Sequence, residues 1–557
     1  MPKPRKKERH ATVLEEGQTF APGDEITAVF EGDRTQLDLG AVARNYKLRD
    51  AYADIRNLEF RADKEVALQA FTDYRRERAP VDRRRYAITT KPRPKFRADE
   101  AYRNRYLPHL YPQGRMLVLV DEDVYGDLKP SIDRYVRDLA RDGYWATVHE
   151  VHAATALEIR SYIRRRRPVG AVLVGAIAAP WFEMDDDFHG HAEFPSDLYY
   201  MDLDGTWGDA DGDGMFDSHG SKVDPEIWVG RIYPPTMGGK DAKMLMDYFD
   251  RNHRFRVGRL GHARSALAYP DDDWQGFSDC ALDLQFPPSA ITVHDAPDVT
   301  DADLYKAEVN ALRSWVQLCA HSSVHSHAFA VSTGTEHIAS PYFRDVNPPN
   351  AHFYNLFCCG PGRYTTNDYL AAWYVFDKEG GGTNQGLAAV ASSKSGSMLF
   401  FEDFYGPLGQ GDTIGDAYLK WWQARGTSHD QFHRRWFYGL TLLGDPTLTW
   451  WKGAVPTLEQ PQKGDVFDQW PRKMQFRWDP VDIPGAKYTV EVDAFGAIKS
   501  GKWAEEVNQT WAVYPNLSGT TVDHTFVGMQ RGRWRVRAEI DGQSCSWSRW
   551  RYFKYTV

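Results

Sequence analysis

The sequence predicts an α/β domain with a doubly wound, mostly parallel sheet, followed by an all-β sandwich. Between residues 116 and about 451, short uninterrupted apolar segments alternate with amphipathic helical patterns, as in parallel strands joined by helices. After residue 455, apolar and polar residues alternate between Pro- and Gly-rich turns, as in the half-buried strands of a sandwich. The 557 residues require more than one domain, because single cores stop growing near about 250–300 residues.

The expected elements follow one another regularly. Strands are expected over residues 116–120, 146–151, 170–175, 227–232, 265–269, 290–293, 315–319, 353–357 and 386–392. Helices are expected over residues 132–139, 159–163, 242–255, 303–312 and 414–424. This number of strands fits either one large sheet or two subdomains side by side.

We expect three domains, over residues 1–113, 114–454 and 455–557. The first is a charged leader with twelve Lys or Arg between Arg75 and Arg105, which is either a solvated surface or linker, or an inhibitory or processed prosegment. The last carries period-two strands over residues 474–478, 488–492 and 533–538 and predicts an immunoglobulin-like sandwich. Its strand patterns resemble a fibronectin type III domain, which implies a surface for a protein partner.

Several classes of function are excluded at this stage. The net charge is −9 and no nucleotide-binding loop or nucleic-acid module is found, so no nucleic acid and no nucleotide cofactor is expected. No segment approaches the roughly 18 apolar residues of a membrane span. The charged start has no apolar stretch behind it. We therefore expect a cytoplasmic product, unless the start codon is misplaced or export is unconventional.

A histidine and two cysteines follow directly on two expected strands. His321 comes after residues 315–319, and Cys358 and Cys359 come after residues 353–357. Open α/β sheets place their sites at the carboxyl ends of the strands, so the imidazole and a thiol are expected at one edge. Adjacent strand residues face opposite ways, so one thiol should face the cleft and the other the core. A thiol with a nearby imidazole is the minimal cysteine hydrolase.

Residues 116–451 resemble the gingipain-type cysteine peptidases, relatives of caspases, legumain and clostripain. Four features carry the resemblance: Ala320-His321 at a strand end, the Cys-x-x-Gly-x-aromatic spacing from Cys359 to Tyr364, Val-Gly-Arg-Ile at Val229 to Ile232, and Leu-x-Gly-Asp-Pro ending at Pro446. The resemblance implies a caspase-like fold and a cysteine endopeptidase acting on protein or peptide substrates.

The resemblance also implies roles for individual residues. Cys359 would be the nucleophile, because only this cysteine gives the family spacing, and His321 would carry the proton. The backbone N–H groups of Cys359 and Ser322 would form the oxyanion hole. The family usually has glycine after the histidine, and Ser322 does not accept a positive φ freely. The alternative is a catalytically retired peptidase fold that acts as a calcium-dependent binding or scaffold protein.

Three further residues have more than one interpretation. His325 or His327 could take the base role by spacing, or join His321 in a zinc site, although no zinc motif supports this. The resemblance places residues 195–200 near the substrate cleft, where Asp197 would select Arg or Lys at P1. The alternative for Asp197 is a turn or cap. A basic P1 preference would make the Arg-rich leader a self-cleavage substrate.

An aspartate-rich loop predicts a structural calcium site. Asp209, Asp211 and Asp213 stand at positions 1, 3 and 5, with Gly214 at position 6, a spacing that converges oxygen ligands on Ca²⁺. The Met215 carbonyl and Asp217 would complete it, whereas position 12 is glycine rather than the glutamate of an EF-hand. The site therefore needs a ligand from elsewhere, and the alternative is an acidic turn without an ion.

Overall fold

The computed structural model describes residues 95–98 and 113–556, with internal gaps. These gaps are residues 221–222, 236–240, 258–259, 262, 297–298, 379–383, 426–429, 451–455, 482–484, 497–502, 505–510, 529, 541–542, 546 and 549. The chain divides into two compact units. The first comprises Met1–Asn252 and His262–Trp450, and the second comprises His253–Gly261 and Trp451–Val557.

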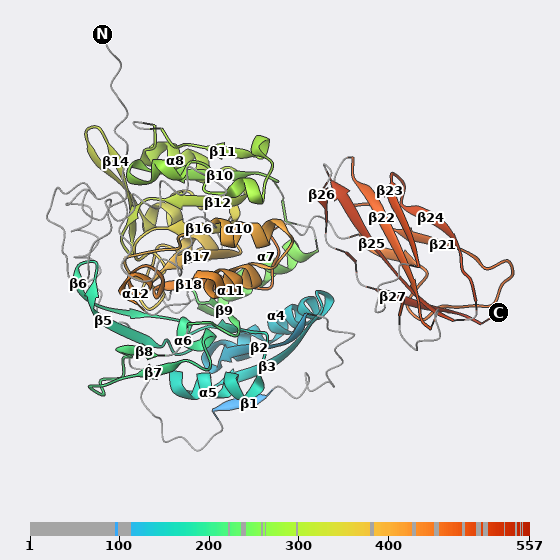
Figure 1. Ribbon diagram of the computed structural model, residues 1–557, viewed down its shortest axis with the longest axis horizontal. Coiled ribbons are helices and arrows are strands. Elements are labelled where there is room, and N and C mark those ends of the chain that lie inside the picture. The colour runs from blue at the N-terminus through green and yellow to red at the C-terminus, as the bar shows by residue number, and fades with distance from the viewer. Residues whose placement is uncertain are drawn as a thin grey trace, which may run out of the picture. The chain divides into compact units, whose positions relative to one another are not determined.

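The first unit is built on one eleven-stranded sheet, in the order β1-β3-β2-β4-β9-β18-β17-β16-β12-β10-β11 (Figure 1). Its strands are β1 (Phe96–Ala98), β2 (Gly114–Asp121), β3 (Tyr144–Val151), β4 (Gly170–Val174), β9 (Trp228–Ile232), β10 (Ala266–Pro270), β11 (Ile291–Val293), β12 (Arg313–Cys319), β16 (Ala351–Phe357), β17 (Ala388–Ser392) and β18 (Leu440–Gly444).

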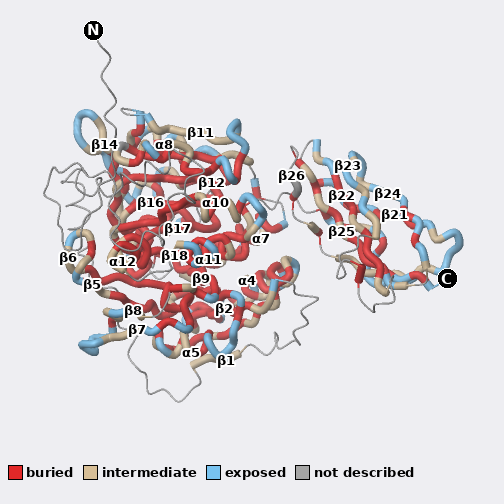
Figure 2. Tube along the Cα trace, viewed as in Figure 1, coloured by how far each residue is buried: buried red, intermediate tan, exposed pale blue. Residues whose placement is uncertain are grey.

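The sheet consists of two parallel blocks that run in opposite directions. Neighbouring strands from β3 to β18 are parallel, as are those from β17 to β11, whereas β17 and β18 pair antiparallel. Most of these strands are buried along their whole lengths (Figure 2). The expected mostly parallel sheet is therefore confirmed, and its two blocks form one continuous sheet.

Helices cover both faces of the sheet. They are α4 (Glu122–Arg141), α5 (Ala156–Arg166), α6 (Leu198–Met201), α7 (Asp241–Arg256), α8 (Ala302–Val309), α9 (Ala372–Val375), α10 (Glu402–Gly409), α11 (Ile414–Arg425) and α12 (Gln431–Phe437). Val316 and Leu318 of β12 join the core cluster that includes α4, α7 and α8 side chains. Trp315 faces the other way and donates a 3.0 Å hydrogen bond to Tyr405 of α10. No described helix is long and apolar enough to cross a bilayer.

Part of the expected leader belongs to the sheet. Strand β1 pairs antiparallel with β3, and Lys95 forms a 2.6 Å ion pair with Glu158 of α5. The domain boundary expected at residue 113 therefore leaves β1 outside the domain whose central sheet includes it. The rest of the leader, including the basic segment from Arg75 to Lys91, lies outside the described residues.

Three small antiparallel elements were not expected. They are the hairpin of β5 (Trp181–Asp187) and β6 (Gly190–Pro195), the pair β7 (Thr206–Gly208) and β8 (Ser218–Gly220), and the sheet of β13 (His321–Ser322), β14 (Ser326–Val331) and β15 (Gly334–Ala339). They lie in the long connections of the central sheet, where the sequence lacks a clear period.

Apart from the end of α7 at His253–Arg256, the described part of the second unit is all-β, as expected for residues 455–557. One sheet contains β19 (Leu458–Gln460), β21 (Lys473–Trp478) and β24 (Thr521–Thr525). The other contains β20 (Val466–Phe467), β27 (Arg551–Tyr555), β25 (Arg531–Ile540), β22 (Lys487–Ala494) and β23 (Ala512–Leu517), and β26 (Gln543–Ser544) pairs with β25. Phe476 of the first sheet packs against Trp534 and Phe553 of the second, with ring centroids 4.8 and 5.8 Å apart. The two sheets therefore enclose an aromatic core.

Candidate active site

The strand register brings the histidine and the cysteines to one edge of the sheet. Strands β12 and β16 are parallel neighbours, with Cys319 opposite Phe357. His321 and Cys359 each follow this pair by two residues, so both chains leave the sheet at the same level. After Cys359 the chain turns at Gly360, whose φ is +79°. The Gly360 N–H donates a 2.8 Å hydrogen bond to the carbonyl of Lys394, which follows β17.

Cys359 lines a small pocket at this edge. The other lining residues are Ser322, Ser323, Val324, Gly360, Arg363 and Ser395. Cys359 is half-buried, whereas Cys358 is only 2% exposed and belongs to the hydrophobic core. The two thiols therefore occupy different environments, although both lie beyond the end of β16 at Phe357. The segment that follows His321 lines the same pocket as Cys359.

His321 is held by a carboxylate that the sequence reasoning missed. Its Nε2 lies 3.1 Å from Oδ2 of Asp273, and the two side chains are 12% and 13% exposed. The ring of Trp274 packs against the imidazole at 4.5 Å. With Nε2 engaged by Asp273, Nδ1 is the ring nitrogen left for proton transfer.

The position of Asp273 follows from the topology. Strand β10 is the parallel neighbour of β12, with Pro270 opposite Cys319, and three aspartates begin directly after β10 at Asp271. An acidic run at the carboxyl end of a strand was therefore the available signal. This signal points to His321 only when β10 is known to lie beside β12.

The Cys359 thiol lies among opposing electrostatic influences. Burial raises its pKa above the ordinary value, and the Asp187 carboxylate acts in the same direction, whereas a hydrogen bond from the Gly396 N–H and the charge of Lys394 lower it. The ammonium of Lys394 is buried and pairs with Asp187 at 2.8 Å. The net effect favours the protonated thiol, so nucleophilic attack requires a base.

Ser322 has an extended backbone rather than a left-handed one, because it lies in strand β13. A positive φ is therefore not needed at the position directly after His321. The Ser322 hydroxyl shares a 2.6 Å hydrogen bond with Nδ1 of His327. The Ser322 side chain is thus anchored in the interior, where it is 1% exposed.

His325 and His327 do not converge with His321. Burial lowers the pKa of His327 to about 3, and its Nε2 is 2.8 Å from the hydroxyl of Tyr374. Nε2 of His325 lies 2.9 Å from the carbonyl of Asn367. Among the described residues, the groups that could bind a metal include none of the three histidines. The structure thus gives no support to the three-histidine zinc site.

Asp197 is committed to an ion pair inside the fold. Arg231 of β9 donates to both carboxylate oxygens, at 2.7 and 2.9 Å, and Tyr364 donates a third hydrogen bond at 3.0 Å. Asp197 and Arg231 are 3% and 1% exposed. Because the carboxylate is already neutralised by a buried guanidinium, we do not retain Asp197 as the residue that selects a basic P1 side chain.

The aspartate-rich loop is ordered by its own backbone. Gly212 and Gly214 donate N–H bonds of 2.8 and 3.0 Å to the two oxygens of Asp209. The Met215 N–H donates to Asp213, and Asp217 accepts from the N–H of Ala210, each at 2.8 Å. Gly220, at position 12, lies in β8 and supplies no side-chain ligand.

Glu183 of β5 reaches this loop from another part of the chain. One oxygen each of Glu183, Asp211 and Asp213 lie within 4.8 Å of one another. Burial and the nearby Asp213 and Asp211 raise the pKa of Glu183. Three converging carboxylates repel one another unless a cation separates them, and hard oxygen ligands suit Ca²⁺. Glu183 could therefore supply the ligand that position 12 lacks.

Comparisons with known proteins give only distant similarities. No family model and no curated protein matches the chain. Among solved structures, it is similar to the complex of Porphyromonas gingivalis RgpB pro- and mature domains, with 12% identity, a TM-score of 0.46, and coverage of 79% of this chain and 100% of that one. It is also similar to the Arg-specific cysteine proteinase gingipain R, with 13% identity, a TM-score of 0.45, and coverage of 79% and 98%.

A fibronectin type III domain from a human protein matches 18% of this chain and 71% of its own, with 17% identity and a TM-score of 0.13. At these values, the similarities establish no shared activity and no shared site residues. The caspase-like and fibronectin type III assignments stay predictions.

Proposed function

We propose that the protein is a cysteine peptidase in which Cys359 is the nucleophile, His321 the proton carrier and Asp273 the group that orients the imidazole. One observation carries this proposal: Cys359 and the segment directly after His321 line one pocket, at the sheet edge where Asp273 holds the imidazole. A nucleophile, a base and a carboxylate that orients the base are the three parts that acyl transfer by a thiol requires.

The electrostatics of the thiol define the order of events. Because the resting thiol is protonated, Nδ1 of His321 takes the proton as Sγ of Cys359 attacks the scissile carbonyl carbon. The carboxylate of Asp273 stabilises the imidazolium that forms. The imidazolium then gives its proton to the leaving amine, and the C–N bond breaks to leave a thioester on Cys359. Water, deprotonated by His321, hydrolyses the thioester and restores the thiol.

The oxyanion of the tetrahedral intermediate would be stabilised by the backbone N–H groups of Cys359 and Ser322. Both residues line the pocket, and Ser322 lies in strand β13 with its hydroxyl hydrogen-bonded to His327. Removing one such donor typically costs about 100–1000-fold in rate. Substrates are proposed to be proteins or peptides. Because Asp197 is neutralised by Arg231, we do not propose that its carboxylate binds an Arg or Lys side chain at P1.

Calcium is proposed to stabilise the loop from Asp209 to Asp217. Asp211, Asp213 and Glu183 offer converging oxygens, and Asp209, Asp217 and the Met215 carbonyl complete the proposed set. The role is structural, because the ion would tie the loop to the β5–β6 hairpin.

A non-catalytic binding protein is the second candidate. It is favoured by the raised pKa of the Cys359 thiol, because many catalytic cysteines have a lowered one. Such a protein would keep the pocket but cleave no peptide bond.

Cleavage assays separate the two candidates. Wild type, Cys359→Ala and, as a control in the second unit, Cys545→Ala are incubated with calcium and peptides carrying Arg, Lys or Asp at P1. We expect wild type and the control to cleave at equal rates, and Cys359→Ala to lose at least 1000-fold, as typical for removal of a nucleophile. Cleavage that persists in Cys359→Ala refutes the proposed nucleophile. Absence of cleavage in all three supports the binding protein.

A further inference from the structure

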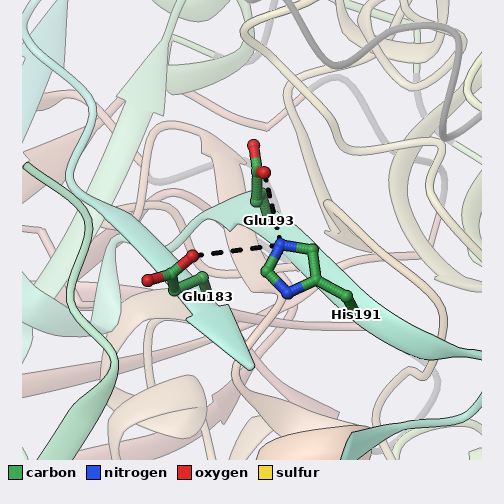
Figure 3. Close-up of side chains that lie close together, drawn as sticks. All are labelled: Glu183, His191 and Glu193. Carbon is green, nitrogen blue, oxygen red and sulfur yellow. Dashed lines mark hydrogen bonds and ion pairs between the residues drawn. The ribbon is translucent and has the colours of Figure 1, made fainter. Parts of the chain in front are cut away.

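A histidine and two glutamates gather on one face of the β5–β6 hairpin, and none of the three side chains lines the Cys359 pocket. Glu183 of β5 stands directly opposite Glu193 of β6 in the antiparallel register. His191 precedes Glu193 by two residues, so its side chain lies on the same face. Figure 3 shows the imidazole directed toward both carboxylates, and its Nε2 is 3.3 Å from Glu193 and 3.9 Å from Glu183.

We propose that Glu183, His191 and Glu193 bind a divalent transition-metal ion of the Zn²⁺ class. One ligand atom from each residue lies within 4.8 Å of the others, which is compact enough for one ion. An imidazole nitrogen with two carboxylates suits Zn²⁺ and related metals, whereas Ca²⁺ takes oxygen ligands alone. This site shares Glu183 with the all-oxygen loop beside it and differs from that loop by its imidazole nitrogen.

The second nitrogen of the imidazole provides independent support. Nδ1 of His191 lies 2.7 Å from the carboxylate of Asp185, on the side of the ring that faces away from the two glutamates. Metal-binding histidines usually donate their other N–H to a carboxylate, which fixes the tautomer and orients the ring. Asp185 occupies this position and leaves Nε2 to bind the metal.

The charge of the cluster also favours a cation. Like charges directly opposite one another across two strands are destabilising, and Glu193 is only 9% exposed in its side chain. Near Glu183, Asp211 and Asp213 add further negative charge. A single imidazolium offsets one of these charges, whereas a divalent ion offsets two and coordinates both glutamates at once.

Equilibrium dialysis against ZnCl₂ tests the proposal. The full chain carrying Cys359→Ser, which removes the accessible thiol, is dialysed without added Ca²⁺, so that Glu183 is not engaged by the calcium loop, and bound zinc is counted. We expect one tightly bound Zn²⁺, with affinity at least 10-fold weaker in His191→Ala and in Glu193→Gln. Asp185→Asn should weaken binding about 10–100-fold, the range typical of outer-shell partners. His189→Ala, on the same hairpin but outside the cluster, is the matched control and should bind as the parent does.

Co²⁺ provides a second readout, because its visible absorption reports the ligand set. The parent and His189→Ala should give the same spectrum, and His191→Ala and Glu193→Gln should lose it. Circular dichroism in the absence of metal shows which variants are folded. Equal zinc binding by all the variants, or no binding tighter than millimolar in the parent, overturns the proposal. In that case the three side chains are an ion-pair network only. Neither result depends on peptidase activity.

Discussion

The buried ion pair of Asp197 and Arg231 allows a direct test of whether Asp197 stabilises the first unit or recognises substrate. Two interpretations of Asp197 make opposite predictions. If Asp197 recognised substrate, Asp197→Asn would change which P1 residue is cleaved and leave the fold intact. If Asp197 neutralises Arg231, the same change leaves the Arg231 guanidinium without its counter-charge at a position that is 1% exposed.

The cost can be estimated from the geometry. Arg231 makes two charge-assisted hydrogen bonds to the carboxylate, at 2.7 and 2.9 Å, and a third bond to the carbonyl of Ile177 at 2.8 Å. Removing one partner of such a buried pair costs about 3–5 kcal/mol, because the remaining charge stays buried without compensation. The double variant Asp197→Leu with Arg231→Met removes both charges, and should recover most of that loss.

Urea unfolding at pH 7, followed by circular dichroism, measures this loss. The two units can unfold in separate transitions, so the transition that shifts must be assigned to the first unit with a truncated or separately labelled chain. Asp127→Asn, an exposed carboxylate in α4, is the control and should change stability by less than about 0.5 kcal/mol. The reasoning is refuted if Asp197→Asn loses less than about 1 kcal/mol, or if the double variant is less stable than the single one.

Three further predictions concern the site and its surroundings. Asp273→Asn should lower kcat/KM about 10–150-fold, because a charge-assisted hydrogen bond contributes about 1.5–3 kcal/mol; a decrease below threefold, or an equal decrease in the exposed control Asp283→Asn, contradicts this. His327 is neutral when buried, with a pKa of about 3 against an ordinary 6.5, so the unfolded state binds its proton first. Folding stability should therefore fall by about 1.4 kcal/mol per pH unit as the pH drops from about 6.5 toward 3. His327→Gln should flatten this slope in urea titrations, and an unchanged slope would contradict the assignment. Calcium at 100 times its dissociation constant should stabilise wild type by about 2.7 kcal/mol in thermal unfolding but not Asp213→Asn, and equal shifts in both would exclude the loop.

Much of the fold could be predicted because its signals are local. Most expected parallel strands are short, mainly apolar segments, and the two-sided burial of β4, β12 and β16 explains their lack of alternation, whereas β3 and β11 are only partly buried. The order of strands and helices along the chain does not predict which strands are neighbours in the sheet. The two blocks meet where β17 pairs antiparallel with β18, and these two segments are about fifty residues apart in the sequence. The sequence pattern of neither strand indicates this pairing.

The site was predictable only where a residue ends a strand. His321 and Cys359 stand out because each directly follows an apolar segment. Asp273 does not stand out, because its role depends on β10 lying beside β12. Asp197 was given a substrate role because its partner Arg231 lies in a distant strand, and the sequence does not show that the two meet. Glu183 was missed for the same reason.

The most direct test of the central claim is covalent labelling by peptidyl chloromethyl ketones with Arg, Lys or Asp at P1. Intact-mass and peptide mass spectrometry then locate the adduct. These reagents first bind as substrates do and then alkylate an active-site nucleophile, so they report the thiol, the base and the pocket together. We predict one adduct per chain, on Cys359, formed at least 100-fold more slowly in His321→Asn. No adduct at Cys359, or labelling at the same rate in wild type and His321→Asn, would contradict the proposed peptidase.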